Sequence, residues 1–327
     1  MGRAWGRNLV DNGDVEIAAW VDIDRGTAES AAGQLGLDNV LTTDDFGKAL
    51  ADVRPDFVVD VTVPAAHRNI TVTALEAGIP VLGEKPMAES MDDARAMVSA
   101  AEKSGRLYMV SQSRRYDNRL HAYRRLIAEQ LGGPIGILKS DFYIGAHFGG
   151  FRAEMPSPLI VDMAIHTFDA ARYLCGLDPV AVYCEESNPH WSWYNGNASA
   201  TAIFEMEGGL RYTYCGSWCA DGKPTSWEAD WRAYGPHGSA FWDGDKAPTA
   251  DVVVEDSGFL RKTDTMVGDI DANYAGGIAG SLRDFVNALK TGQTPMGECH
   301  DNIKSLAMVM AAVESSKTGR RVSIDSI

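Results

Sequence analysis

The sequence predicts an α/β protein in which a doubly wound parallel sheet is followed by a second, α+β domain with a large, mostly antiparallel, open sheet. Two observations support this prediction. Apolar strand patterns alternate with helical patterns up to about Tyr116, and strand patterns then follow one another without helices between them over residues 180–254. A chain of 327 residues is also long enough for about two domains. We therefore expect domains at residues 1–116 and 117–327.

The N-terminal part carries segments with the composition of strands buried on both faces. These are Val15–Val21, Phe57–Thr62, Pro80–Leu82 and Leu107–Ser111. Most of the accompanying helical patterns end at a glycine, the residue most often found just beyond a helix. The helices are expected at Arg3–Asp11, Thr27–Leu35, His67–Ala77 and Asp92–Ser104. Strands and helices that alternate in this way are typical of a doubly wound sheet.

The pattern changes after Tyr116. Helices are expected at Arg119–Gln130, Leu159–Leu174, Ala279–Lys290 and Asn302–Ser315. Strands are expected at Ile135–Ile144, Val180–Glu185, Ala200–Glu205, Leu210–Trp218, Glu228–Tyr234, Ala250–Val254 and Val322–Ile324. Several of these strands follow one another directly, which indicates antiparallel pairing.

Charge and cysteine content exclude several classes of partner. The formal net charge is −15, from 30 Lys and Arg against 45 Asp and Glu, so nucleic acid and anionic membranes are not expected to bind. The sequence lacks an apolar run of about 18 residues, so we expect no membrane span, and the N-terminal residues lack an apolar segment, so we expect no signal peptide. Its 5 cysteines form no C-x-x-C and no Cys/His spacing typical of zinc. We therefore expect a reduced, cytoplasmic protein without a metal site.

Part of a dinucleotide-binding unit is recognisable near the N-terminus. Such a unit consists of a strand, a glycine-rich turn, a helix, a second strand and an acidic residue. Gly2 opens a helical pattern, and Asp22 stands at the end of the next strand, twenty residues later. A carboxylate there hydrogen-bonds the ribose hydroxyls of NAD and repels the 2′-phosphate of NADP, whereas Arg25 would pair with that phosphate. We predict NAD, with NADP possible; Asp22 and Asp24 are also compatible with helix-capping carboxylates.

The first strand and the first two glycines of this unit are absent from the sequence. Gly2 takes the place of the third glycine, so about ten residues would be missing. Loss of a central strand would expose the edges of its neighbours. We therefore expect Met1 to be an internal methionine with the natural start upstream; a stop codon there, with no Gly-x-Gly coding sequence, would contradict this. The alternative is a complete chain with another cofactor geometry, or with none.

Three further motifs carry a family resemblance. Gly83-Glu84-Lys85-Pro86 follows an apolar strand, and Asp60-Val61-Thr62-Val63-Pro64 precedes it, with His67 three residues beyond Pro64. Asp162-Met163-Ala164-Ile165-His166 lies on a predicted helix. Together these motifs resemble the Gfo/Idh/MocA family of nicotinamide-dependent oxidoreductases, from Gly2 to Val322. The resemblance implies hydride transfer between NAD(P) and a secondary alcohol of a sugar, cyclitol or related polyol.

The physical chemistry of the motif residues agrees with catalysis. Asp162 and His166 are four residues apart and share one helix face. Imidazole titrates near neutral pH, so His166 suits the acid/base role, and Asp162 would hold a substrate hydroxyl. Lys85 ends a parallel strand, where ligands of such sheets bind, and would stabilise a developing alkoxide. Taken singly, each residue is also compatible with an ordinary surface position, but polar groups on so apolar a helix are costly unless used.

The resemblance implies further contacts with the cofactor and with the substrate. The cofactor would be met by Gly2, Asp22, Arg25, Thr62, Pro64, His67, Glu84, Lys85 and Gln112. The substrate would be met by Lys85, Arg115, Tyr143, His147, Arg152, Asp162 and His166. His67 is also compatible with packing at a helix N-terminus, and Asp169 with orienting His166 or with packing. The aromatic loop of residues 190–194 is compatible with sugar stacking, with packing or with a subunit contact.

Two other functions stay open on the same scaffold. One is an NAD-dependent glycosidase, which would release free sugar without net NADH. The other is a non-enzymatic, NAD-sensing regulatory protein, although the presence of both Lys85 and His166 argues against it. In each case the partner is a small molecule, and the resemblance implies a homodimer or homotetramer formed through the C-terminal sheet.

Overall fold

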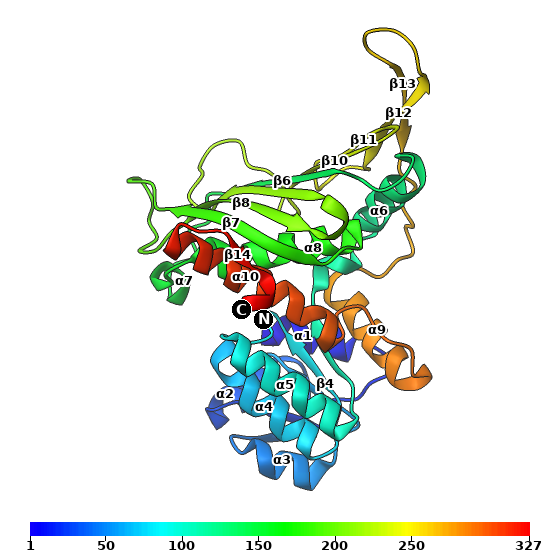
Figure 1. Ribbon diagram of the computed structural model, residues 1–327. Coiled ribbons are helices and arrows are strands. Elements are labelled where there is room, and N and C mark those ends of the chain that lie inside the picture. The colour runs from blue at the N-terminus through cyan, green and yellow to red at the C-terminus, as the bar shows by residue number, and fades with distance from the viewer. The chain divides into compact units, whose positions relative to one another are not determined.

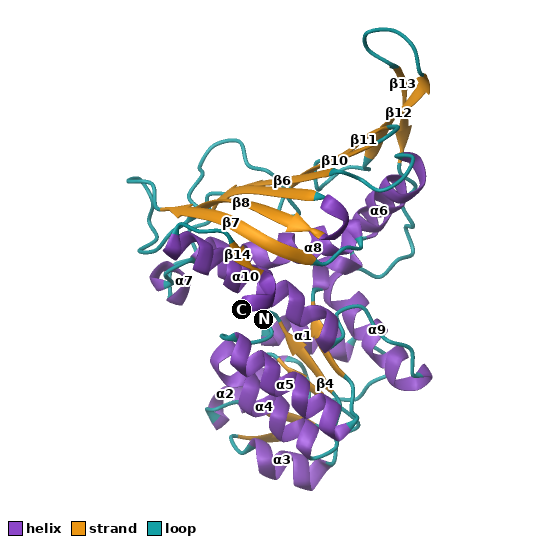
Figure 2. Ribbon diagram, viewed as in Figure 1, coloured by secondary structure: helices purple, strands orange, loops and turns teal.

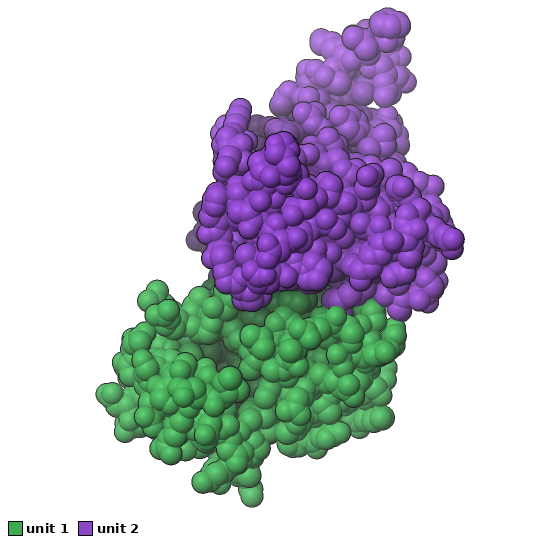
Figure 3. Space-filling model, turned by 90° about the vertical axis from the view of Figure 1, so that its left-hand side faces the viewer, with its two compact units in different colours: residues 1–113, 276–303 green, residues 114–275, 304–327 purple.

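The computed structural model describes residues 1–327 as two compact units (Figure 3). Unit 1 comprises Met1–Ser113 and Gly276–Ile303, and unit 2 comprises Arg114–Ala275 and Lys304–Ile327. The first limit lies close to the expected boundary after residue 116, but the chain returns to unit 1 after Ala275. This return differs from the expected division. A helical pattern reveals which face of a helix is buried but not what covers it.

Unit 1 contains two parallel ladders of strands, which form separate sheets. One ladder pairs β1 (Ala19–Val21) with β2 (Leu41–Thr43), and the other has the order β3 (Val58–Asp60), β4 (Val81–Glu84), β5 (Tyr108–Ser111). In the doubly wound order one more strand lies between two such ladders, and none of residues 1–327 forms it. Only the last three residues of the expected strand Val15–Val21 pair with a neighbour.

Helices accompany these strands as the alternating pattern predicted. They are α1 (Gly2–Val10), α2 (Arg25–Gln34), α3 (Phe46–Val53), α4 (Pro64–Glu76), α5 (Met91–Ser104) and, from the returning segment, α9 (Gly277–Thr291). Side chains cap three of them, because Asp24, Asp45 and Ser90 accept hydrogen bonds from backbone N–H groups of the first turn. Helix α9 packs against α1 and reaches the start of β3, where Phe285 meets Phe57 edge to face at 5.4 Å. The pattern had not indicated β2 or α3.

Unit 2 is built on a nine-stranded sheet of the order β13-β12-β11-β10-β6-β9-β8-β7-β14 (Figure 1). The strands are β6 (Ile137–Tyr143), β7 (Pro179–Ser187), β8 (Ser199–Met206), β9 (Arg211–Ser217), β10 (Asp230–Gly235), β11 (Gly238–Trp242), β12 (Thr249–Glu255), β13 (Lys262–Val267) and β14 (Val322–Ser323). Neighbours pair antiparallel except β6 and β9. The predicted fold class is thereby confirmed. Strands β11 and β13 were missed, and β13 is exposed along its whole length, so it has no buried face to produce a pattern.

Helices cover one face of this sheet and leave the other without any (Figure 2). Unit 2 contains α6 (Asn118–Gln130), α7 (Phe151–Glu154), a π-helical turn η2 (Leu159–Ala164), α8 (Ile165–Cys175) and the larger part of α10 (Cys299–Thr318). Short 3-10 turns lie at Ser113–Tyr116, Glu207–Gly209 and Ile324–Ser326. Phe168 of α8 anchors the covered face, 4.8 Å from the Phe204 ring and 5.2 Å from the Tyr214 ring. None of the helices combines the length and the apolar composition that a membrane span requires.

Candidate active site

Asp162 and His166 lie on the accessible stripe of a largely buried helix. The segment begins as the π-helical turn Leu159–Ala164 and continues as α8. Met163, Ala164 and Ile165, which separate the two polar residues, are fully or almost fully buried, whereas Asp162 and His166 are half-buried. A π-helical turn inside a helix is uncommon and is frequent at functional sites. Both residues of the predicted pair are therefore less buried than the residues between them, although the Asp162 side chain is only 13% exposed.

Arg152 holds the carboxylate of Asp162. Its Nε donates to Asp162 Oδ2 at 2.5 Å, and its guanidinium lies 4.7 Å from the Phe151 ring and 5.2 Å from the Phe148 ring. The structure thus brings together two residues that the sequence assigned to substrate binding. An ion pair of this kind orients the carboxylate, and the remaining guanidinium nitrogens keep their donor capacity.

Exposed aromatic rings surround this ion pair. Phe148 lies 5.3 Å from Trp218 and 6.2 Å from Trp227, and Phe148, Phe151 and Trp227 each expose about half of their surface or more. These three residues stand singly in loops and a short helix, where no periodic pattern marks them, so the sequence did not predict them. Exposed aromatic surface beside a charged pair is suited to stacking on an apolar ring face of a ligand.

The aromatic loop of residues 190–194 supports the segment that carries Phe148. Trp193 Nε1 donates to the carbonyl oxygen of Ala146 at 3.0 Å, and the Tyr194 hydroxyl donates to the same oxygen. His147 stacks on the Trp193 ring with a centroid distance of 3.5 Å. Of the alternatives left open for this loop, the structure therefore supports packing for Trp193 and Tyr194.

Two residues expected at the substrate are placed elsewhere. Tyr143 alternates along β6 with the buried residues Leu138, Ser140 and Phe142, so it lies on the sheet face without helices, opposite α8. Arg115 is buried and makes a bidentate ion pair with Asp169, with both N···O distances 2.7 Å. Ser305 Oγ also donates to Asp169 at 2.7 Å. We therefore assign Arg115 and Asp169 a structural role, which one-dimensional spacing does not reveal.

Lys85 directly follows strand β4 in unit 1, and the peptide bond to Pro86 is cis. Glu84, before it, is buried and accepts hydrogen bonds from Trp5 Nε1 at 2.7 Å and from the Lys85 backbone N–H at 3.0 Å. Burial raises the pKa of the Glu84 carboxyl, although the hydrogen bond from Trp5 opposes the shift. The carboxylate thus fixes the turn that presents Lys85.

His67 joins the two loops that end strands β3 and β4. Its Nδ1 is 3.0 Å from the carbonyl oxygen of Pro86, and its Nε2 is 3.1 Å from that of Thr62. The Thr62 hydroxyl donates to Asp60 at 2.6 Å, and Pro64 is the first residue of α4. The buried imidazole therefore positions both loops, in agreement with the packing alternative for His67.

Residues at the ends of β1 and β5 fit a dinucleotide. Ser111 ends β5 and Gln112 follows it, and both amide atoms of Gln112 and the Ser111 hydroxyl are buried without hydrogen-bond partners, as expected for groups that a ligand completes. Asp22 directly follows β1 and is half-buried. Arg25 pairs with Glu29 at 2.9 Å and is thereby drawn towards its own helix. Carboxyl ends of parallel strands are where ligands of such sheets bind.

The close approach of helix α1 to the sheet occurs at Gly6 rather than at Gly2. A Cβ atom on Gly6 would lie 2.5 Å from Leu35 and 2.8 Å from Trp20, whereas one on Gly2 would meet no atom within 4 Å. Gly2 does open α1, as predicted. The helix-to-strand packing expected of a dinucleotide-binding unit thus depends on a glycine that the sequence analysis had not singled out.

Two sequence models of one family match the chain. The first, described as "Oxidoreductase family, NAD-binding Rossmann fold", matches residues 1–112, and the second, "GFO/IDH/MocA C-terminal domain", matches residues 120–241. The chain belongs to the Gfo/Idh/MocA family of oxidoreductases. The predicted family, its NAD-binding domain and the oxidoreductase class are thereby confirmed.

Curated relatives and solved structures agree with this assignment. A scyllo-inositol 2-dehydrogenase (NAD(+)) of Bacillus subtilis is 24% identical over 92% of this chain and 86% of its own. A D-apiose dehydrogenase of Paraburkholderia graminis is 26% identical over 95% and 84%. An oxidoreductase from Agrobacterium radiobacter, solved with NAD+, L-tartaric acid and magnesium, has a TM-score of 0.85 at 23% identity and covers 99% of this chain and 96% of that one.

Proposed function

We propose that the protein oxidises a secondary alcohol of a sugar, cyclitol or related polyol, with NAD as hydride acceptor and His166 as acid/base group. The observation that carries this proposal is the placement of Asp162 and His166 at half-buried positions of a largely buried helix. Burying polar groups without use is costly, and here the half-buried carboxylate is held by Arg152 beside exposed aromatic rings.

The residues of the chain divide the chemistry between them. NAD, when bound, supplies the hydride acceptor. His166 takes the hydroxyl proton during oxidation and returns it during reduction. Lys85 donates a hydrogen bond to the reacting oxygen and stabilises the negative charge that develops there. Asp162, oriented by Arg152, accepts a hydrogen bond from a neighbouring substrate hydroxyl.

The substrate class follows from the surface near Asp162. Phe148, Phe151 and Trp227 offer aromatic faces, which pack on the C–H faces of sugar and cyclitol rings. The ion pair supplies both an acceptor and donors for hydroxyl groups. The relatives named for inositol and for D-apiose favour the same class.

A substrate screen tests this proposal. The full chain is incubated with NAD+ and a panel of inositols, aldoses and linear polyols, and NADH formation is followed by its absorbance. We expect NADH with at least one cyclic polyol or aldose. Saturable NADH binding with no oxidation across the panel would contradict the substrate class. Release of free sugar from an aryl glycoside without net NADH would identify the glycosidase instead.

The cofactor preference is tested at Asp22. We propose that its carboxylate binds the adenosine ribose of NAD, so Asp22→Ala should weaken NADH binding more than NADPH binding. Quenching of tryptophan fluorescence measures both affinities. Asp38→Ala, which removes an exposed carboxylate from the same unit, is the matched control. Equal losses for both cofactors in Asp22→Ala would contradict the assignment.

We further propose that the face of the nine-stranded sheet without helices binds a second copy of the chain. Apolar and aromatic side chains are exposed along it, among them Ile137, Tyr183, Ile203, Tyr234 and Phe241. Tyr183 and Ile203 are cross-strand partners, so they form one continuous apolar surface, which is typical of an interface. Sedimentation should show a dimer or tetramer that Ile203→Lys dissociates and that the control Val254→Lys leaves intact. A wild-type monomer would contradict the proposal.

A further inference from the structure

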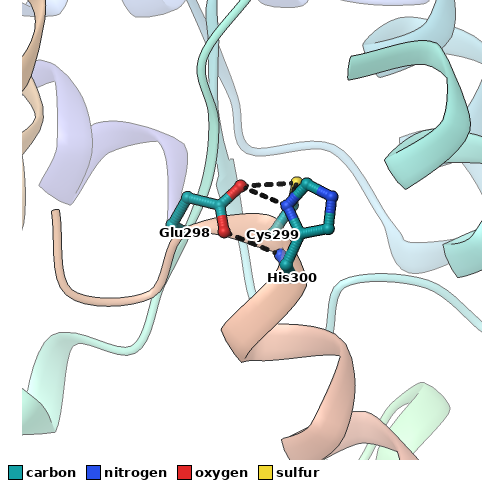
Figure 4. Close-up of side chains that lie close together, drawn as sticks. All are labelled: Glu298, Cys299 and His300. Carbon is teal, nitrogen blue, oxygen red and sulfur yellow. Dashed lines mark hydrogen bonds and ion pairs between the residues drawn. The ribbon is translucent and has the colours of Figure 1, made fainter. Parts of the chain in front are cut away.

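Three consecutive residues with metal-binding side chains converge where helix α10 begins (Figure 4). Glu298 Oε1 lies 2.9 Å from Cys299 Sγ and 2.8 Å from His300 Nδ1, and the sulfur lies 3.5 Å from that nitrogen. The ligand atoms all lie within 4.8 Å of one another. The cluster belongs to unit 1, and none of its members was assigned a role in the proposed oxidation.

We propose that Glu298, Cys299 and His300 form a binding site for one divalent transition-metal ion of the Zn²⁺ type, with Glu102 supporting His300 from its far side. One carboxylate oxygen, one thiolate sulfur and one imidazole nitrogen make up a mixed donor set that suits Zn²⁺. Mg²⁺ and Ca²⁺ prefer oxygen ligands only. Solvent would complete the fourth position.

The spacing of the donor atoms fits tetrahedral coordination. Ligand bonds of about 2.3 Å to sulfur and about 2.0–2.1 Å to nitrogen place these two atoms about 3.6 Å apart in a tetrahedron, and the observed separation of Sγ and Nδ1 is 3.5 Å. The carboxylate oxygen lies closer to both because it now accepts hydrogen bonds from them. It must withdraw by less than about 1 Å to reach the same geometry. The Glu298 side chain is 20% exposed and the His300 side chain 54% exposed, so solvent reaches the cluster.

Glu102 provides the outer contact that metal-bound histidines normally have. His300 Nε2 lies 3.2 Å from Glu102 Oε1, across the ring from Nδ1. A carboxylate in this position accepts the Nε2 proton and thereby leaves the Nδ1 lone pair free for the ion. Glu102 belongs to α5 and His300 to the returning segment, so the carboxylate and the imidazole come from different parts of unit 1.

Metal binding would displace the protons that Cys299 Sγ and His300 Nδ1 share with Glu298 in the free protein. In the free protein the Cys299 thiol donates a hydrogen bond to Glu298 Oε1 at 2.9 Å, and His300 Nδ1 lies 2.8 Å from the same oxygen. Binding of M²⁺ would form the metal–sulfur and metal–nitrogen bonds, and the protons that Sγ and Nδ1 carried would pass to solvent, while Nε2 keeps the proton that it shares with Glu102; no oxidation state changes.

The ion would fasten the returning segment to the sheet of unit 1. Glu298 forms an isolated antiparallel bridge with Met109 of β5, and the Val110 N–H donates to the Gly297 carbonyl oxygen at 2.8 Å. Through Glu102 the site also reaches α5. The expected function of the site is therefore structural: it stabilises the contact between the returning segment and the rest of unit 1.

Titration of the full, reduced chain with Co²⁺ tests the proposal, because a thiolate ligand gives cobalt a charge-transfer absorption band. We expect one equivalent of Co²⁺ with that band, proton release on binding, and displacement by Zn²⁺ but not by Mg²⁺. Cys299→Ser should abolish the band, and His300→Ala, at a largely exposed position, should weaken binding without disturbing the core. Cys175→Ser is the matched control and should leave the band unchanged.

Glu102 gives a second, graded test. Glu102→Gln should lower the affinity for Co²⁺ about 10–100-fold, as loss of an outer-sphere carboxylate does, whereas Glu76→Gln on α4 should not change it. A titration without a charge-transfer band overturns the proposal. So does a band that persists in Cys299→Ser, or one that Mg²⁺ displaces as readily as Zn²⁺.

Discussion

Two of the groupings of a carboxylate with a histidine in this protein are built differently. Asp162 and His166 stand four residues apart on a buried helix, and a cation, Arg152, holds the carboxylate. Glu298 and His300 stand two apart at a helix start and hydrogen-bond each other directly at 2.8 Å. The spacing of the two residues along the chain thus decides whether their side chains contact each other. In the first arrangement a cation rather than the histidine holds the carboxylate, and in the second the donor atoms of both residues lie together around one point.

The largest effect is expected at His166, because it would carry the proton of the reaction. His166→Ala should lower kcat by about 10²–10⁴-fold and leave the affinity for NADH nearly unchanged. Steady-state kinetics with the substrate found in the screen, together with fluorescence titration of NADH, measures both quantities. His190→Ala removes an exposed histidine of the same unit and is the control. Near-normal turnover in His166→Ala would remove this residue from the mechanism.

The next effect is a loss of stability, and it concerns Asp169, the buried carboxylate of helix α8. Asp169 is buried and paired with Arg115, so Arg115→Ala leaves a charge without its partner. Loss of one partner of a buried ion pair costs about 3–5 kcal/mol in the free energy of unfolding. Urea unfolding measures this change. The exposed pair of Arg261 with Asp256 gives the control Arg261→Ala, which should hardly move the midpoint. Equal shifts in both variants would show that Arg115 and Asp169 contribute little.

A smaller effect separates orientation by Arg152 from direct catalysis. Arg152→Gln frees the Asp162 carboxylate and should lower kcat/KM about tenfold, with Asp162→Asn causing a similar loss. Because the two side chains act through one contact of 2.5 Å, the double variant should lose much less than the product of the single losses. Kinetics of the four proteins form the cycle. Strictly multiplicative losses would mean that the ion pair has no part in the reaction.

The smallest effect is expected at Glu186, a carboxyl group whose pKa is shifted mainly by burial. Burial raises its pKa from 4.5 to about 7, so the folded protein binds the proton more tightly than the unfolded chain between these values. Stability from this group is therefore present at low pH and is lost as the pH rises towards about 7. Glu186→Gln should raise the urea midpoint at pH 8 more than at pH 4, two values on either side of the window. The exposed neighbour Glu185 gives the control Glu185→Gln.

The fold and the helix with Asp162 and His166 were readable from local patterns. Alternating apolar segments and terminal glycines depend on neighbours in the sequence, and they located most strands and helices. Strand β13 was not predicted because all of its residues are exposed. Helix α9 was expected in the second domain but belongs to unit 1, because its partner Phe57 is distant in sequence. A helical pattern shows that a face is buried but gives no partner.

The contacts around the candidate site were readable only in part. Arg152 was predicted at the substrate and does meet Asp162. The pairing of Arg115 with Asp169 is a tertiary contact, and the orientation of Tyr143 depends on which face of β6 the helices cover. The sequence did not predict the cluster of Glu298, Cys299 and His300. Zinc motifs are recognised by spaced pairs of ligands, whereas here three adjacent residues bring their side chains together at the start of a helix.

Rescue of His166→Ala by added imidazole tests the central claim most directly. If His166 moves the proton, imidazole should restore part of the lost NADH formation in a saturable manner, and it should not accelerate the wild type or His190→Ala. The recovered rate should rise with the concentration of the neutral base as the pH increases through the pKa of imidazole. A His166→Ala variant that turns over like the wild type, or one whose residual rate ignores imidazole and buffer bases, would contradict the assignment of the proton to His166.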